Sequence, residues 1–163
     1  MKRFADVLNF IDFKDICCGC KANCCRRFYA VLLSEEESEF ESVYDEIYTQ
    51  FGPIKTLGNL KSACPFLSKD GLCTIYQRRP FDCKVWPIVM YLDLETNDRI
   101  VYLDMDCEAV KDDRIPRNLI EKIVEVLKNL PVDDDWLKRY TSAPWPNNFI
   151  EIARFKTFKN IEK

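Results

Sequence analysis

Apolar side chains recur every three or four residues in several parts of the chain, which is the spacing of one helix face. Residues 3–16 predict a short N-terminal helix. The clearest helix is predicted to begin at Ser34, in the capping box Ser34-Glu35-Glu36-Glu37, and to end at Gly52-Pro53. Its apolar stripe consists of Phe40, Val43, Tyr44, Ile47 and Phe51. A further helix is predicted after Pro116, and a short one at 133–140.

Short runs rich in β-branched and aromatic residues predict antiparallel strands between these helices. A strand is expected at 28–33. Residues 64–67 and 72–76 flank Asp70-Gly71, a strong turn signal, and predict a hairpin with one cysteine in each arm. Residues 85–94 and 99–105 predict a second strand pair. The expected fold class is therefore α+β, with small antiparallel hairpins and flanking helices.

The composition is that of an ordinary globular protein, with 163 residues, 47% hydrophobic and 31% charged. The net charge of −3 argues against a general nucleic-acid binder. The longest apolar run, 85–92, contains Pro87 and is far shorter than the ~20 residues of a membrane span. Acidic residues interrupt the N-terminal region where a secretory signal needs an apolar core. We therefore expect a cytoplasmic protein without a membrane segment.

The nine cysteines and the absence of histidine change this picture. In a reducing compartment, many cysteines more often bind metal or act in catalysis than form disulfides, and an odd number cannot pair completely. Without histidine, a two-Cys, two-His zinc finger, a three-His zinc site and catalysis by an imidazole base are all excluded. A soft-metal site in this chain must consist mostly or wholly of thiolates.

The cysteines are concentrated in the pattern Cys17-Cys18-x-Cys20-x3-Cys24-Cys25, and single cysteines follow at 64, 73, 83 and 107. Two thiolates separated by two residues can turn back onto one metal ion, and five exceed the four positions of one tetrahedral ion. The pattern matches neither the paired knuckles of a zinc ribbon nor the ferredoxin or radical-SAM runs. Spacing alone therefore leaves the metal open, and a single cysteine such as Cys18 can also be a small buried apolar residue.

Three ordered segments carry most of these cysteines: Cys17-x2-Cys20-x3-Cys24-Cys25-Arg26, Cys64-Pro65-Phe66-Leu67 and Cys73-Thr74-Ile75-Tyr76-x2-Arg79-Pro80-x2-Cys83. Over about residues 15–107, the chain resembles the YkgJ-like cysteine-cluster family, whose members are described as zinc- or iron-chelating domains with eight cysteines. The resemblance implies metal ligands at Cys17, Cys20, Cys24, Cys25, Cys64, Cys73 and Cys83, with Cys107 as the eighth. Three residues separate Cys20 from Cys24 where many members have two, and Cys18 is an addition to the pattern.

The same pattern suggests how the chain is divided. Residues 1–112 are expected to form a cysteine-cluster metal-binding domain, and 113–163 a C-terminal helical extension packed on it in a single globular unit. Arg79 is a candidate cofactor-binding residue, because a guanidinium can donate hydrogen bonds to cluster sulfur and offset its negative charge. The alternative for Arg79 is an ion pair with an acidic residue such as Asp82.

These observations favour a metal-binding protein that holds an iron–sulfur cluster, or iron, and has a redox or cluster-dependent role. It would be an iron–sulfur oxidoreductase if that role is enzymatic, and its protein or redox partner is not specified. The alternative cofactor is zinc, held as a structural staple of an interaction module. Flagellin lysine methylases carry a similar cluster, which implies a modifying enzyme as a weaker alternative. The chain has only four glycines and no Gly-x-Gly fingerprint for a nucleotide or methyl donor.

Overall fold

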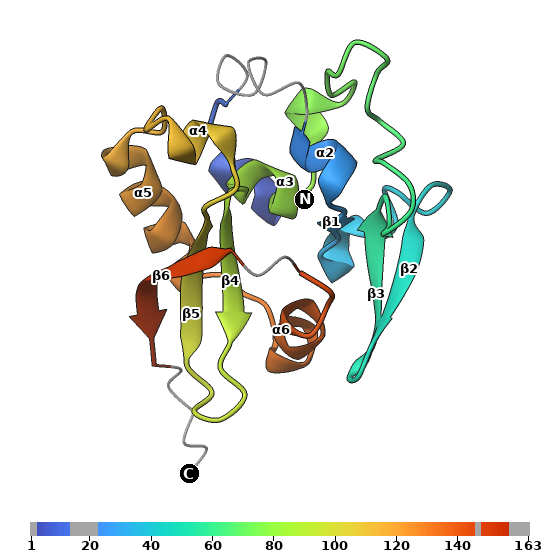
Figure 1. Cartoon of the computed structure of the whole chain (residues 1–163). Coiled ribbons are helices and arrows are strands. Elements are labelled where there is room, and N and C mark those ends of the chain that lie inside the picture. The colour runs from blue at the N-terminus through green and yellow to red at the C-terminus, as the bar shows by residue number, and fades with distance from the viewer. Residues whose placement is uncertain (1–2, 14–22, 146–147, 157–163) are drawn as a thin grey trace.

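The computed structural model describes residues 3–13, 23–145 and 148–156 of the chain. In these residues, two three-stranded antiparallel sheets lie on opposite sides of α3 (Phe81–Val85), as Figure 1 shows. The fold class is α+β with hairpins, as the sequence predicts. The other short helical elements are η1 (Phe4–Leu8), α2 (Asn23–Arg27), η3 (Tyr76–Arg78) and α4 (Glu108–Lys111). Within the described part of the chain, we find no helix of the length and apolar character that crossing a bilayer requires.

The first sheet has the order β1 (Ala30–Val31), β3 (Gly52–Leu57), β2 (Asp45–Thr49). Ile47 on β2 pairs with Ile54 on β3, and both side chains are buried. The same part of the molecule contains a small core of three fully buried residues, Leu32, Phe40 and Leu57. Val31, Ile47 and Ile54 of this sheet belong to the main hydrophobic core, so the first sheet shares its apolar packing with the rest of the molecule.

The helix predicted from Ser34 to Gly52 is wrong beyond its first turns. The segment begins with a 3-10 turn, η2 (Ser34–Glu36), and turns continue to Tyr44, but the chain then enters β2. Val43 and Phe51, two members of the supposed apolar stripe, are exposed. Gly52 has φ +117°, which permits a tight turn into β3, and pairing with β3 satisfies the backbone of β2. Tertiary pairing thus overrides the helical periodicity.

The second sheet has the order β4 (Ile88–Leu92), β5 (Arg99–Asp104), β6 (Phe149–Phe155). The β4–β5 pair confirms the strand pair predicted at 85–94 and 99–105. Strand β6 was not predicted, because its sequence mixes Glu and Arg with aromatic residues.

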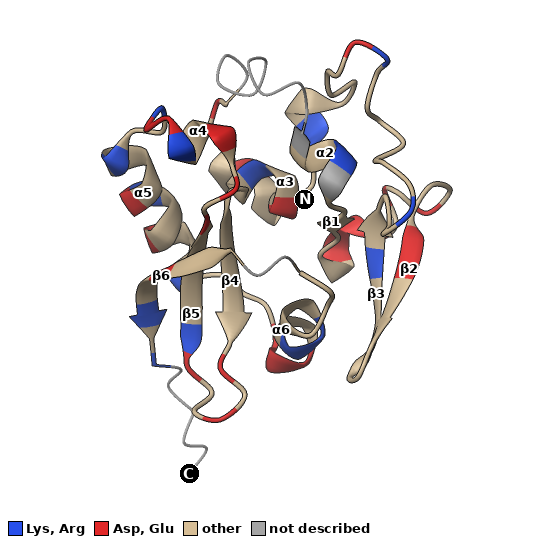
Figure 2. Ribbon diagram, in the orientation of Figure 1, with Lys and Arg blue, Asp and Glu red and all other residues tan. Residues whose placement is uncertain are grey.

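Two helices from the C-terminal part of the chain contact this second sheet. They are α5 (Arg117–Lys128) and α6 (Asp134–Thr141), and both are predicted by the sequence. The carboxylate of Asp133 caps α6 by accepting a hydrogen bond from the Trp136 N–H at 2.7 Å. Acidic and basic residues are interspersed along α4 and α5 (Figure 2).

Buried charged side chains fix α3 to three other elements. Asp82 accepts hydrogen bonds from the backbone N–H of Val31 (2.9 Å) and from the Tyr140 hydroxyl (2.7 Å). Lys84 donates to the Ala5 carbonyl at 3.2 Å. Helix α3 is therefore connected to β1, α6 and η1 through partners that satisfy its buried charges.

Glu36 secures the start of α3. It is fully buried, and its carboxylate accepts hydrogen bonds from the N–H groups of Phe81 (2.7 Å) and Leu33 (2.9 Å). Burial raises the pKa of Glu36 to about 7, although both hydrogen bonds and the charge of Arg3 act in the opposite direction. Ionised Glu36 is thus costly in the folded protein at neutral pH.

We expect this carboxyl group to make the metal-free protein more stable in mild acid than at neutral pH. A folded-state pKa above the ordinary value means that this stability is present below about pH 4.5 and is lost as the pH rises through about 7. The expected loss is up to about 3 kcal/mol. Denaturant unfolding at pH 5 and pH 7.5 measures it. In Glu36→Gln, the unfolding free energy should no longer fall by this amount between pH 5 and pH 7.5. The control Glu41→Gln, at an exposed position, should keep the wild-type fall. An unchanged fall in Glu36→Gln contradicts the assignment.

Candidate metal centre

The described cysteines of the predicted ligand set come from separate parts of the fold. Cys24 and Cys25 lie in α2, Cys64 and Cys73 flank the turn at 68–71, Cys83 lies in α3, and Cys107 immediately precedes α4. All are half-buried. Cys17, Cys18 and Cys20 lie outside the described residues.

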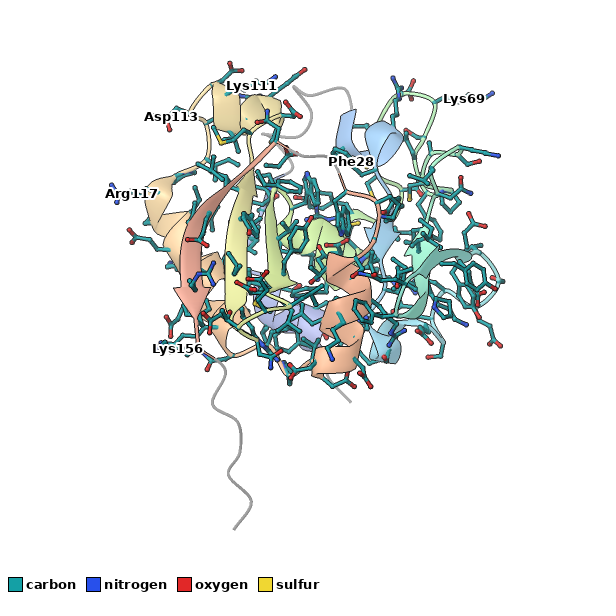
Figure 3. The ribbon with its side chains drawn as sticks, turned by 60° about the horizontal axis from the view of Figure 1, so that its bottom comes forward. Phe28, Lys69, Lys111, Asp113, Arg117 and Lys156 are labelled. Carbon is teal, nitrogen blue, oxygen red and sulfur yellow. The ribbon has the colours of Figure 1, made fainter. Side chains whose placement is uncertain are left out.

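The loop that carries Cys64 and Cys73 keeps the predicted turn but only part of the predicted hairpin. Its arms meet in a single bridge between Leu67 and Cys73, and Gly71 adopts φ +78° in the turn. Lys69 at the tip points outward (Figure 3). At the base of the loop, a Cβ on Gly58 would lie 3.1 Å from the Cys64 nitrogen. The close approach of Gly58 therefore helps to fix the position of Cys64.

Five cysteines from these segments lie close enough to influence one another. The Cys64 N–H donates to the Cys25 carbonyl at 3.2 Å, which joins the loop to α2. The Cys25 side chain interacts electrostatically with Cys24, Cys64 and Cys83, and Cys64 interacts with Cys24 and Cys73. Cys107 is partly buried and packs against the main hydrophobic core. Within the described residues, no group of three or more Cys, Asp or Glu side chains is arranged to hold a metal ion.

The neighbouring thiols oppose one another's ionisation. The pKa of Cys25 is raised by a hydrogen bond with the Cys24 side chain, by burial and by the charges of neighbouring cysteines. Burial first, and the charge of Asp82 second, raise the pKa of Cys83 well above its ordinary value. Burial is also the main cause of the raised pKa of Cys64. A bound cation removes this conflict, because coordination deprotonates a thiol and the ion's charge offsets the thiolates.

A family described as "CxxCxxCC: Putative zinc- or iron-chelating domain" matches residues 16–108. The chain belongs to this family. The match confirms the resemblance seen in the sequence and spans every position of the predicted ligand set. Chelation of zinc or iron is therefore the supported role of the CxxCxxCC domain. No curated protein and no solved structure matches the chain.

Aromatic rings lie beside the cysteine segments of this CxxCxxCC domain. Phe28, which follows α2, packs against Trp86 at the end of α3, with ring centroids 5.0 Å apart. Figure 3 places Phe28 toward the middle of the molecule. Trp86 in turn stacks on Trp145 at 6.0 Å. The aromatic packing joins α2 to α3, and so joins Cys24 and Cys25 to the segment of Cys83.

The ion pair considered for Arg79 and Asp82 is not formed. The carboxylate of Asp82 binds Val31 and Tyr140. Arg79 lies over the Tyr76 ring, with its guanidinium carbon 3.9 Å from the ring centroid. Its Nε donates to the Tyr76 carbonyl (3.0 Å), and Nη1 donates to the Cys83 carbonyl at 3.4 Å. Arg79 is thus directed along the segment that carries Cys83.

Tyr76 is a further site residue, and its hydroxyl group makes two hydrogen bonds to the N-terminal segment. The hydroxyl accepts a hydrogen bond from the Phe13 N–H (2.8 Å) and donates one to Asp12 (3.1 Å). These hydrogen bonds fix the chain beside η3 just before the cysteine-rich segment. At the end of that segment, the hydrogen bond from the Cys64 N–H to the Cys25 carbonyl fixes the chain beside Cys64. Cys17 and Cys20 fall between these two fixed points in the sequence.

Tyr76→Phe should weaken metal binding as well as the fold. Loss of the hydroxyl leaves the Phe13 N–H without its acceptor, which is expected to cost about 1–2 kcal/mol of unfolding free energy. Metal affinity should fall by roughly 10-fold, the lower end for groups that orient ligands. Chelator competition measures the affinity. The control is Tyr48→Phe, which removes the hydroxyl of a ring that is 77% exposed and should change neither quantity; equal metal affinity in both variants contradicts the role of Tyr76.

Proposed function

We propose that the chain holds an iron–sulfur cluster through cysteine thiolates and has a redox or cluster-dependent role. The proposed ligands are Cys17, Cys20, Cys24, Cys25, Cys64, Cys73, Cys83 and Cys107. The observation that carries the proposal is the match of residues 16–108 to a zinc- or iron-chelating family. The mutual electrostatic influence of Cys24, Cys25, Cys64, Cys73 and Cys83, which come from three separate parts of the fold, supports it. Five thiols exceed the four ligands of one tetrahedral zinc ion, and the chain has no histidine to act as a ligand.

The protein's own contribution is to hold the thiols and limit access to them. Half-burial of the described cysteines keeps the centre within reach of a partner at the surface. The hydrogen bonds of Glu36, Asp82 and Tyr76 fix the backbone from which the ligands project. A bound cluster supplies one-electron redox chemistry, with a potential set by its charge, hydrogen bonds and exposure. In this proposal, the cluster exchanges electrons with a protein redox partner in the cytoplasm.

Structural zinc is the second candidate, and the small core beside the first sheet favours it. That core has three buried residues among those described, Leu32, Phe40 and Leu57, with Cys64, Phe66 and Ile75 of the cysteine-bearing loop partly buried against it. A core of this size leaves room for a bound metal to add to the stability of the loop. Closed thiolate sites around zinc contribute folding energy directly. In that case the protein is an interaction module whose partner binds elsewhere on its surface.

Anaerobic purification of the full chain separates these two candidates. The same sample is used for a visible absorption spectrum and for iron, zinc and acid-labile sulfide analysis. Broad visible absorption with iron and sulfide in similar amounts supports the cluster. A colourless protein with stoichiometric zinc and no sulfide overturns the redox proposal and supports the structural one.

A further inference from the structure

Arg79 is a buried cation whose hydrogen bonds to described residues are all to neutral groups. Its residue is 8% exposed, and its guanidinium lies on the Tyr76 ring. Its two hydrogen bonds go to the carbonyl groups of Tyr76 and Cys83. Carbonyl groups satisfy donors but carry no net charge. A buried charge without an opposite charge is strongly unfavourable, so the position of Arg79 calls for an anion.

The carboxylates near Arg79 in the described chain are engaged with other groups. Asp82, three residues away, binds Val31 and Tyr140. Glu39 binds the neighbouring Arg78 at 2.7 Å, and none of the described ion pairs includes Arg79. Arg78 and Arg79 are therefore adjacent in sequence but opposite in environment: Arg78 has a 68% exposed side chain and a carboxylate partner.

Cys83 is the proposed metal ligand that Arg79 contacts directly, through its backbone carbonyl. The Arg79 Nη1 donates to the carbonyl of Cys83 at 3.4 Å, so the buried positive charge lies against the segment that carries this proposed ligand. A divalent ion with four thiolates carries a net charge of about −2, and that charge is spread over the sulfur atoms. A fixed guanidinium beside one of the ligand segments is suited to offset it.

We infer that Arg79 is the counter-charge of the metal–thiolate centre, held in place by Tyr76 and the Cys83 carbonyl. The inference rests on the proposed metal binding but not on which metal is bound. It assigns Arg79 a positioning and electrostatic role rather than a catalytic one. The positive charge of Arg79 then stabilises the metal-bound protein and destabilises the metal-free protein.

This role predicts effects of opposite sign in the two forms of the protein. Arg79→Gln removes the charge, so the metal-free protein should melt at the same temperature or higher at pH 7, where an ordinary thiol is protonated. The same change should weaken metal binding by about 10–100-fold. A purely structural arginine would instead lower the melting temperature of the metal-free protein when its hydrogen bonds are lost.

The experiment is a cobalt(II) titration of the metal-free full chain, read by the thiolate-to-metal absorption and by chelator competition. The variants are Arg79→Gln, Arg79→Lys, which keeps a positive charge, and the matched control Arg78→Gln. If the purified protein carries an iron–sulfur cluster, its reduction potential replaces the affinity. Arg79→Gln should then make the reduction potential more negative by about 60–120 mV. This shift corresponds to the same 10–100-fold change at 59 mV per tenfold.

Support requires weaker cobalt binding or a lower potential in Arg79→Gln, substantial recovery in Arg79→Lys, wild-type behaviour in Arg78→Gln and no loss of stability in the metal-free form. Unchanged affinity or potential in Arg79→Gln overturns the inference while leaving metal binding in place. A destabilised or unfolded metal-free Arg79→Gln overturns it too, because it shows a structural role. Failure of the wild-type chain to bind cobalt or iron overturns both the inference and the proposed function.

Discussion

Cys83→Ser is expected to release most of the bound metal. Cys83 lies in α3, the element that Glu36, Asp82 and Lys84 fix in place, so a new ligand cannot easily move into its position. Structural zinc sites contribute roughly 12 kcal/mol at pH 7, and one of four ligands accounts for about 3 kcal/mol of that. Metal affinity should therefore fall by more than about 100-fold. Chelator competition on the full chain measures the loss.

The matched control for this variant is Cys18→Ser, since the family pattern does not require that cysteine. It should retain the metal content and affinity of the wild-type protein. The melting temperature of the metal-loaded form should fall strongly in Cys83→Ser and stay unchanged in Cys18→Ser. Equal metal content in Cys83→Ser and the wild-type protein would remove Cys83 from the ligand set.

Metal affinity should rise steeply with pH, and metal binding should release protons. The pKa values of Cys25, Cys64 and Cys83 are raised, so these thiols are protonated at neutral pH until a metal displaces their protons. For about four thiolates per ion, the affinity should increase by up to about 10⁴-fold per pH unit. Titration calorimetry in buffers with different heats of ionisation counts the protons released at pH 7.

The same pKa shifts give the stability of the two forms opposite pH dependence. In the metal-free protein, a raised thiol pKa favours the protonated form, so stability falls as the pH rises through the ordinary thiol value of 9.0 toward the raised ones. In the loaded protein, acid displaces the metal, so stability falls in the other direction. Release of fewer than one proton per metal ion would show that the thiols are not the ligands.

The sequence predicts the second sheet and its helices better than the first sheet. The β4–β5 pair and α6 have local signals that act alone: continuous runs of β-branched and aromatic residues in the strands, and the Asp133 cap of the helix. The segment 34–52 has a capping box and a helical apolar stripe, yet Ile47 is buried by pairing with Ile54 on β3. Strand pairing is a long-range interaction, and periodicity in one segment cannot reveal it.

The candidate site divides in a similar way between what the sequence shows and what only the structure shows. Cysteine is rare and chemically distinctive, so its clustering and ordered spacing identify candidate ligands directly. Glu36 looks like part of a solvated acidic helix turn, but it is buried against the start of α3. The hydroxyl contacts of Tyr76 join residues 63 and 64 positions apart, and no local pattern predicts them.

The central claim is that the cysteines of this chain hold a metal, and native mass spectrometry of the anaerobically purified full chain tests it most directly. We expect the native mass to exceed that of the bare chain by the mass of whole metal ions or of a cluster. The excess should be lost on acidification, reduced in Cys83→Ser and retained in Cys18→Ser. A bare-chain mass for the wild-type protein before and after incubation with zinc or iron and sulfide, together with nine freely reactive thiols, would contradict it.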